Sequence, residues 1–223
     1  MNALHAYPEL IGSLKAVIKV NVYLALGDSI TAGYGVESPF SFPSLYAAFL
    51  QRHNPDLHMI NCGVNGLSTC GLLDLLQTNH NLRHSVSQAS LITLTIGSND
   101  LLHLIGNPNQ IMNTSLKHMF NTMGQNLTQI GDTFRRLNSR ATVKVATLYN
   151  PLPAGPYVQY FEQAQGVLDN ANAMIVTWAK RYGADPVYID REFRGKERLL
   201  IDRDYVHPNA AGYQVMAKTF ARY

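Results

Sequence analysis

Residues 23–33 read Tyr-Leu-Ala-Leu-Gly-Asp-Ser-Ile-Thr-Ala-Gly. The apolar first half of this stretch predicts a buried strand, which stops at a Gly-Asp-Ser turn. Ser29 would then lie at the carboxyl end of a strand, where open α/β sheets hold their ligands. Aspartate and serine also end strands and cap helices in many proteins, so the turn alone does not establish a reactive serine.

Three later stretches carry similar polar turns. Residues 61–66 read Asn-Cys-Gly-Val-Asn-Gly, residues 96–100 read Ile-Gly-Ser-Asn-Asp, and residues 204–208 read Asp-Tyr-Val-His-Pro. Each follows a predicted strand or precedes a predicted helix. One such turn would be a weak signal, whereas four in this order form a specific pattern.

The four blocks together resemble the GDSL (SGNH) family of serine esterases and lipases. The matching positions are Ser29, Gly66, Asn99 and His207. The resemblance covers nearly the whole chain, from about residue 20 onward. The family usually has leucine after its serine, and this chain has Ile30 there, which is a mild departure.

Strands and helices alternate along the rest of the chain. Apolar, β-branched runs predict strands over residues 20–26, 57–61, 91–96, 142–148 and 187–189. Apolar residues at helical spacing predict helices after Pro43, over 72–77 with a less clear continuation to 86, over 112–137, over 161–182, and from about Pro208. A charged loop is expected over 191–203.

This alternation, with no break in composition, predicts a single three-layer α/β/α domain over residues 1–223. Residues 1–19 are a lead-in segment to which no role is assigned. The family resemblance implies a flavodoxin-like, doubly wound, parallel five-stranded sheet with strand order 2-1-3-4-5.

Two packing details are also expected from helical spacing. The helix after Pro43 should bury a face that carries Leu45, Ala48 and Phe49. In the 112–137 helix, Gly124 and Gly131 are seven residues apart and share a face. Their lack of side chains suggests a close approach of this helix to the sheet.

Composition and charge exclude several classes of protein. The chain has 223 residues, with 18 Lys and Arg against 15 Asp and Glu, spread along the sequence without a basic stripe. Nucleic acid is therefore not the expected partner. No apolar run approaches the roughly 20 residues that span a bilayer. Residues 1–20 lack the features of a secretory signal, so a cytoplasmic location is expected. Cys62 and Cys70 are expected to be buried thiols rather than a disulfide.

Ester hydrolysis needs an activated nucleophile, a base and donors to the oxyanion. The resemblance implies that Ser29 is the nucleophile, His207 the base and Asp204 the residue that orients His207. Asp202 is a nearby competitor of Asp204. The turn is not the G-x-S-x-G elbow of α/β-hydrolases, because residue 31 is threonine.

The resemblance also implies an oxyanion hole. Its donors would be the backbone N–H groups of Ser29 and Gly66 and the side-chain amide of Asn99. Gly63 is the alternative glycine. Asp28 is expected to hold the serine turn. Asp100 is expected to support the loop in which it lies.

No metal or cofactor is assigned. His80 and His84 are four residues apart and could share a helical face, but no carboxylate or cysteine at suitable spacing completes a metal site. A non-catalytic flavodoxin-like binding module is the competing class. It is disfavoured because Asp28 would repel a phosphate group at the first strand's turn.

The expected substrate is a small-molecule acyl ester or lipid with a short-to-medium acyl chain. Lysophospholipase, thioesterase and sugar-ester deacetylase activities of the same family stay open, as does transfer to an acceptor other than water. Residues 101–105, 150–156 and 199–201 are candidate walls for an acyl chain, although the two apolar stretches could equally belong to the core.

Overall fold

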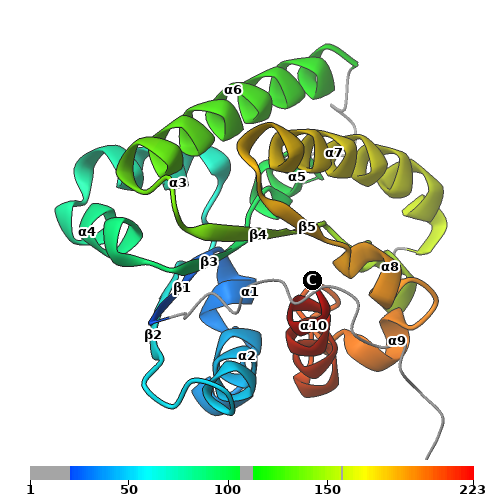
Figure 1. Cartoon of the computed structure of the whole chain (residues 1–223). Coiled ribbons are helices and arrows are strands. Elements are labelled where there is room, and N and C mark those ends of the chain that lie inside the picture. The colour runs from blue at the N-terminus through cyan, green and yellow to red at the C-terminus, as the bar shows by residue number, and fades with distance from the viewer. Residues whose placement is uncertain (1–20, 106–112, 157) are drawn as a thin grey trace, which may run out of the picture.

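A five-stranded parallel sheet forms the centre of the molecule (Figure 1). The computed structural model describes residues 21–105, 113–156 and 158–223. The strands are β1 (Val22–Gly27), β2 (His58–Gly63), β3 (Leu91–Thr95), β4 (Thr142–Ala146) and β5 (Asp185–Val187). Their order is β2-β1-β3-β4-β5, which confirms the order implied by the family resemblance.

Helices connect the strands and cover both faces of the sheet. The α-helices are α1 (Ser29–Ala32), α2 (Phe42–Gln51), α3 (Thr69–Thr78), α4 (His80–Gln88), α5 (Ser98–Ile105), α6 (Asn113–Leu137), α7 (Phe161–Tyr182), α8 (Ile189–Phe193), α9 (Glu197–Leu200) and α10 (Ala210–Arg222). Short 3₁₀ turns occupy Ser38–Phe40 (η1), Leu152–Ala154 (η3) and Val158–Tyr160 (η4).

The sheet separates two apolar cores, as the alternation of side chains along β1 shows. Leu24 and Leu26 point into the core shared with α3, α4, α6 and α7. Tyr23 and Ala25 point into the core shared with α2 and α10. In Figure 1 the first group of helices lies above the sheet and the second group below it. The α/β/α prediction is therefore confirmed.

The β1–α1 turn has its own stabilising contacts. Asp28 is the N-cap of α1, and its Oδ1 accepts the backbone N–H of Ile30 at 3.0 Å. The same oxygen accepts the Thr95 hydroxyl of β3 at 2.9 Å. Gly33 ends the helix with φ of 81°. The prediction that Asp28 holds the serine turn is confirmed, and Ser29 becomes the first residue of a helix only four residues long.

The predicted buried face of α2 is confirmed in part for Leu45, which is half-buried against the core, and is wrong for Ala48 and Phe49. The buried residues are Phe42, Pro43, Tyr46 and Ala47, whereas Ala48 and Phe49 are exposed. Both sets have helical spacing, so periodicity could not choose between them. Tertiary contacts decide: the Phe42 ring stacks on Phe220 of α10, and the Tyr46 hydroxyl accepts a hydrogen bond from Lys144 of β4.

The role predicted for the two glycines of α6 is also wrong. They face α7, not the sheet. A Cβ on Gly131 would lie 2.5 Å from the Tyr182 ring, and one on Gly124 would lie 3.5 Å from the sulfur of Met174. Gly131 therefore allows α6 and α7 to pack closely around Tyr182.

Some element boundaries differ from the prediction. Residues 69–88 form two helices, because the side chain of Asn79 caps α4 by accepting the Leu82 N–H at 3.0 Å. The fifth strand ends at Val187, and Ile189 begins α8. The expected charged loop contains α8 and α9. The last helix begins after Asn209, its N-cap, so Pro208 lies outside it.

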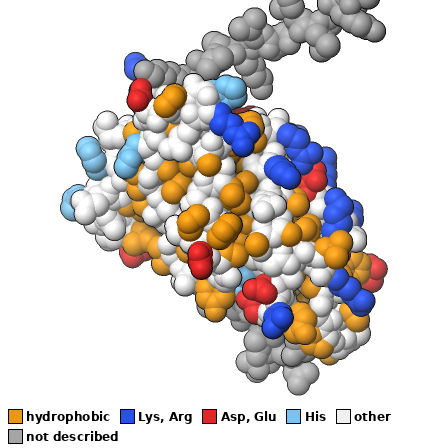
Figure 2. All heavy atoms as spheres, turned by 90° about the horizontal axis from the view of Figure 1, so that it is seen from below, with side chains coloured by type: hydrophobic (Ala, Val, Ile, Leu, Met, Phe, Trp, Pro, Cys, Tyr) orange, Lys and Arg blue, Asp and Glu red, His pale blue; other side chains and the backbone are white. Residues whose placement is uncertain are grey.

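Figure 2 views the side on which α2 and α10 lie in Figure 1. Lys and Arg side chains gather along one edge of this face with acidic side chains among them, and apolar side chains are scattered across the middle. No helix in the described part of the chain is long and apolar enough to cross a membrane. Cys62 and Cys70 are both free thiols; Cys62 is half-buried but Cys70 is exposed, so the expectation of two buried thiols is wrong for Cys70.

Candidate active site

Ser29, His207 and Asp204 form one hydrogen-bonded series. The Ser29 Oγ lies 2.9 Å from Nε2 of His207, and Nδ1 of the same ring lies 2.6 Å from Oδ2 of Asp204. Ser29 begins α1 at the end of β1, while the other two residues lie in the loop between α9 and α10. The fold thus brings together residues that are 178 positions apart in the sequence.

The loop that carries His207 is held by its own backbone. An antiparallel bridge joins Ile201 to Pro208, and the Asp202 N–H donates to the carbonyl of His207 at 2.8 Å. At the tip, Tyr205 has a positive φ of 59°. These contacts hold His207 in a closed turn.

Asp204 and Asp202 play different parts in this loop. Oδ1 of Asp204 accepts the backbone N–H groups of Val206 and His207, both at 3.0 Å, which leaves Oδ2 for the imidazole. The Asp202 carboxylate accepts the N–H of Arg203 at 2.8 Å. Asp204 is therefore the aspartate whose carboxylate contacts the His207 ring.

The surroundings of Asp204 keep it ionised. Partial burial acts to raise the pKa of its carboxyl, but hydrogen bonds from the His207 backbone and ring and from the Val206 N–H outweigh that effect. The pKa of Asp204 therefore lies below its ordinary value. At neutral pH the carboxylate accepts a hydrogen bond from Nδ1–H, which favours the tautomer whose unprotonated Nε2 faces Ser29.

A second carboxyl group near the site, that of Asp28, is buried at the β1–α1 turn. Burial raises the pKa of Asp28 to about 6, against the opposing hydrogen bonds from Thr95 and Ile30 and the attraction of His207. Above that pH Asp28 is ionised, and its carboxylate adds negative charge beneath the serine turn.

Among the residues that the structure describes, the backbone N–H groups of Ser29 and Gly66 have no hydrogen-bond acceptor. Gly66 has φ of 76°, a conformation that glycine adopts at low cost, and a Cβ there would meet nothing within 4 Å. Gly63 differs, because a Cβ on it would lie 2.1 Å from the backbone nitrogen of Ala32. Gly63 therefore serves the packing of β2 against α1.

Asn99 lies in the first turn of α5, and its side chain reaches the loop between β2 and α3 that contains Gly66. Its Nδ2 donates to the Leu67 carbonyl at 2.9 Å, so one amide hydrogen is held and the second is left for another acceptor. Asp100 fixes the same loop by accepting the backbone N–H and the hydroxyl of Thr69, at 2.9 and 2.5 Å. The predicted supporting role of Asp100 is confirmed, since the same two bonds hold its own segment, which is the first turn of α5 rather than a loop.

Three tyrosines contact this region and were not predicted. The Tyr34 ring lies against His207, with centroids 4.3 Å apart. The Tyr149 hydroxyl donates to the Val206 carbonyl at 2.7 Å, and the Tyr213 hydroxyl donates to the Tyr34 carbonyl at 2.9 Å. Burial raises the pKa of both donating tyrosines, so they stay protonated and able to donate. For Tyr34, the sequence signal is its position between two glycines after the serine turn.

The apolar stretches predicted as walls divide between core and surface. Leu101, Leu200 and Ile201 are buried in the cores, whereas Leu102 and Leu199 are 41% and 72% exposed. The side chains of residues 103–105 lie outside the described set. In the Pro-rich loop over residues 150–156, a Cβ on Gly155 would lie 2.8 Å from the Tyr205 ring. This loop therefore packs beside the loop that carries Asp204 and His207.

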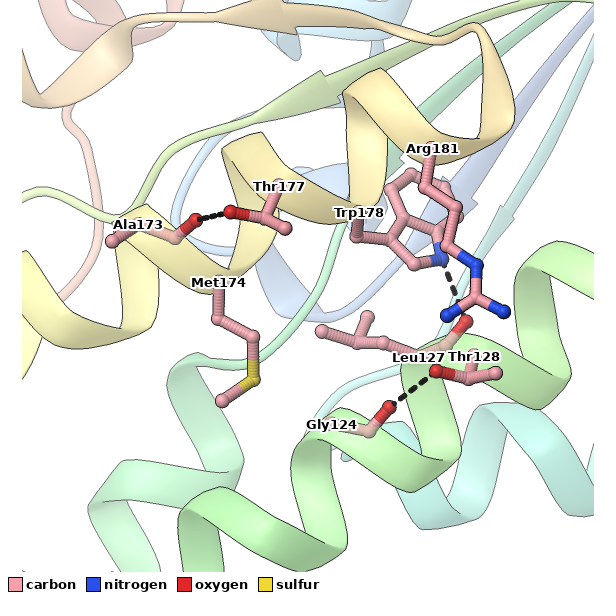
Figure 3. A pocket seen from close by; sticks show the side chains of 8 residues that line it. All are labelled: Gly124, Leu127, Thr128, Ala173, Met174, Thr177, Trp178 and Arg181. Carbon is pink, nitrogen blue, oxygen red and sulfur yellow. Dashed lines mark hydrogen bonds between the residues drawn. The ribbon is translucent and has the colours of Figure 1, made fainter.

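A groove lies between α6 and α7, away from Ser29 (Figure 3). It measures about 310 Å³ and is lined by Gly124, Leu127, Thr128, Ala173, Met174, Thr177, Trp178 and Arg181. Its hydroxyl and indole donors are already bonded to backbone carbonyls, as the dashed lines in Figure 3 show. The groove shares no residue with the Ser29 site. Among the described residues, no three His, Cys, Asp or Glu side chains are grouped to hold a metal ion.

Comparisons with known proteins identify the family of this chain. Residues 25–215 match the GDSL-like Lipase/Acylhydrolase family. The chain is 26% identical over 216 residues to the spore germination lipase LipC of Bacillus licheniformis, covering 88% of this chain and 92% of that protein.

Solved structures share the fold. A lipase from a goat rumen metagenome, Lip_vut3, superposes with a TM-score of 0.75 at 23% identity and covers 90% of this chain and 96% of its own. An acetyl xylan esterase from Geobacillus stearothermophilus superposes with a TM-score of 0.67 at 17% identity and covers 91% and 93%. The family match spans most of the chain, including the serine turn and the histidine loop. The chain therefore belongs to the GDSL-like lipase/acylhydrolase family and is an enzyme of the carboxylic ester hydrolase class.

Proposed function

We propose that this chain hydrolyses carboxylic esters through a covalent acyl-enzyme formed on Ser29. The observation that carries the proposal is the series of contacts from the Ser29 hydroxyl through His207 to Asp204, at 2.9 and 2.6 Å. Nε2 of His207 accepts the hydroxyl proton as Ser29 attacks the ester carbonyl, and it then donates that proton to the leaving alcohol. A water molecule, activated by the same nitrogen, releases the acid.

The oxyanion formed during attack needs donors that do not have to reorganise. The proposed donors are the backbone N–H groups of Ser29 and Gly66 and the second amide hydrogen of Asn99. Support comes from the unpaired state of both N–H groups among the described residues, and from the bond to Leu67 that orients the Asn99 amide.

The proposed substrate is a small-molecule ester with a short-to-medium acyl chain. Leu102 and Leu199, both exposed, are the candidates for apolar contacts with the acyl group. A cavity of about 10 Å³ beside Ile30, Thr95 and Ser98 has room for about one water molecule, not for an acyl tail. We propose that the acyl chain lies instead along the surface that carries Leu102 and Leu199.

A panel of esters tests this substrate class. We expect kcat/KM for p-nitrophenyl esters to peak between acetyl and octanoyl and to fall for palmitoyl. An acetylated xylo-oligosaccharide, a lysophospholipid and an acyl thioester, assayed beside the panel, separate the other activities of this family. A preference of tenfold or more for any of these three, or for the palmitoyl ester, would contradict the proposed substrate. Product analysis with an added alcohol separates hydrolysis from acyl transfer.

The proposed role of Asn99 predicts a selective loss of kcat. Asn99→Ala should lower kcat by about 10²–10³-fold, because one oxyanion donor is lost, while KM changes little. Steady-state kinetics measure both constants, and thermal unfolding of the same preparation measures stability.

Asn126→Ala is the matched control, because Asn126 also supports this loop. Its amide donates to the Thr69 hydroxyl at 3.1 Å but is not a proposed donor to the oxyanion. This variant should lower the melting temperature and leave kcat per folded molecule near wild type. Equal losses of kcat in the two variants would mean that Asn99 acts only through the loop.

A further inference from the structure

Tyr34 follows the serine turn in a backbone arrangement that only glycines allow at low cost. It lies between Gly33 and Gly35, whose φ values are 81° and 86°. The chain thus turns back at the end of α1, and the Tyr34 N–H donates to the carbonyl of Ser29 at 3.0 Å. A Cβ on Gly33 would lie 2.5 Å from the Cβ of Ser41, so this turn is closely packed.

The Tyr34 side chain extends over the proposed base. Its ring centroid lies 4.3 Å from that of His207, with an angle of 34° between the rings. The backbone under this ring is fixed at both ends, since Tyr213 of α10 donates its hydroxyl to the Tyr34 carbonyl at 2.9 Å. Tyr34 is 48% exposed and belongs to neither apolar core.

We infer that Tyr34 is a positioning residue that holds the His207 ring and stabilises the imidazolium formed when that ring takes the Ser29 proton. This inference rests on the proposed function. The face of an aromatic ring carries negative charge density, and a cation within about 6 Å of its centroid is attracted to it. Neutral imidazole gains less from this contact than imidazolium does. The contact is therefore stronger in the transition state than in the resting enzyme.

Other groups near His207 also affect its charge, and all are retained in the test. The carboxylate of Asp204 bonds to Nδ1, and the buried Asp28 carboxyl interacts with the ring through space. Asp202 contacts His207 through its backbone N–H. Tyr149 and Tyr213 lie near these carboxylates and are protonated. These groups are the same in every Tyr34 variant, so a difference between the variants comes from the Tyr34 side chain.

The experiment compares Tyr34→Phe, which keeps the ring, with Tyr34→Leu, which removes it. We expect Tyr34→Phe to hydrolyse a p-nitrophenyl ester at a rate near wild type. Tyr34→Leu should lose roughly 3- to 30-fold in kcat, with KM nearly unchanged. The acidic limb of its plot of kcat/KM against pH should also move to lower pH, because the imidazolium has lost a stabilising contact. Phe40→Leu removes an aromatic ring of similar exposure, 49%, from the neighbouring η1 turn and controls for the loss of surface apolar area.

Each outcome decides for or against the inference. It is overturned if Tyr34→Leu matches Tyr34→Phe in an active enzyme, or if its rate falls equally at all pH values with the acidic limb unmoved, as a structural role predicts. An equal loss in Tyr34→Phe would assign the effect to the hydroxyl and would also overturn it. If Tyr34→Leu does not fold, Tyr34→Met at the same position replaces it. Failure of the proposed function is recognised separately, because wild type would then be inactive or insensitive to Ser29→Ala.

Discussion

Ser29→Ala should lower kcat toward ester substrates by about 10⁴–10⁶-fold, the scale of losses seen when a serine nucleophile is removed. Among the described residues, the Ser29 hydroxyl has one hydrogen-bond partner, Nε2 of His207, so its loss should leave the melting temperature nearly unchanged. A fluorophosphonate probe should add one label to the wild-type chain, on the peptide that contains Ser29, and none to the variant.

Ser98→Ala is the matched control for the nucleophile. Ser98 lines the small cavity that also contacts Ile30 and Thr95, so it lies close to the turn, but it has no histidine partner in the described part of the chain. It should keep activity and labelling close to those of wild type. A label on Ser98, or a Ser29→Ala variant that keeps activity and label, would remove Ser29 from the mechanism.

Asp204→Asn should lower kcat by about 10⁴-fold, as in a serine triad whose aspartate is changed to asparagine. The substitution keeps an acceptor for the N–H groups of Val206 and His207, so the loop should stay folded. If the amide nitrogen takes the place of Oδ2, it donates toward Nδ1 and favours the imidazole tautomer in which Nε2 carries the proton. That tautomer cannot accept the proton of Ser29.

Asp202→Asn tests the competing aspartate in the same loop. Its carboxylate caps the Arg203 N–H and has no contact with the His207 ring among the described interactions. We expect kcat/KM of Asp202→Asn to stay near wild type. A large loss in this variant together with an active Asp204→Asn would reverse the assignment of the two aspartates.

The sequence allowed prediction of those parts of the site that depend on local chemistry. A polar turn after an apolar strand predicted where Ser29 lies, and the family resemblance, through its Asp-x-x-His spacing, led to the choice of Asp204 as the partner of His207. The order of the strands came from the family resemblance, because alternation alone cannot tell which strands are neighbours.

The parts that could not be predicted depend on contacts between distant segments. Contacts with Phe220 and Lys144, which are far away in the sequence, determine which face of α2 is buried. Contact with Tyr182 likewise determines that Gly131 faces α7. Tyr34 and its partner Tyr213 are separated by 179 residues. No local pattern marks the hydroxyl of one as the donor to the carbonyl of the other.

The distance in sequence between Ser29 and His207 also has a consequence for folding. Parallel strands cannot be joined by tight hairpins, so each pairing in this sheet closes a long loop, and contacts of this kind form slowly. During synthesis the serine leaves the ribosome 178 residues before the histidine. A nascent or partly folded chain that lacks the loop before α10 therefore holds a serine without its base. With Ser29 and His207 in their proposed roles, hydrolytic activity should begin only when the two distant segments meet, and the unfinished chain should not attack esters while it folds.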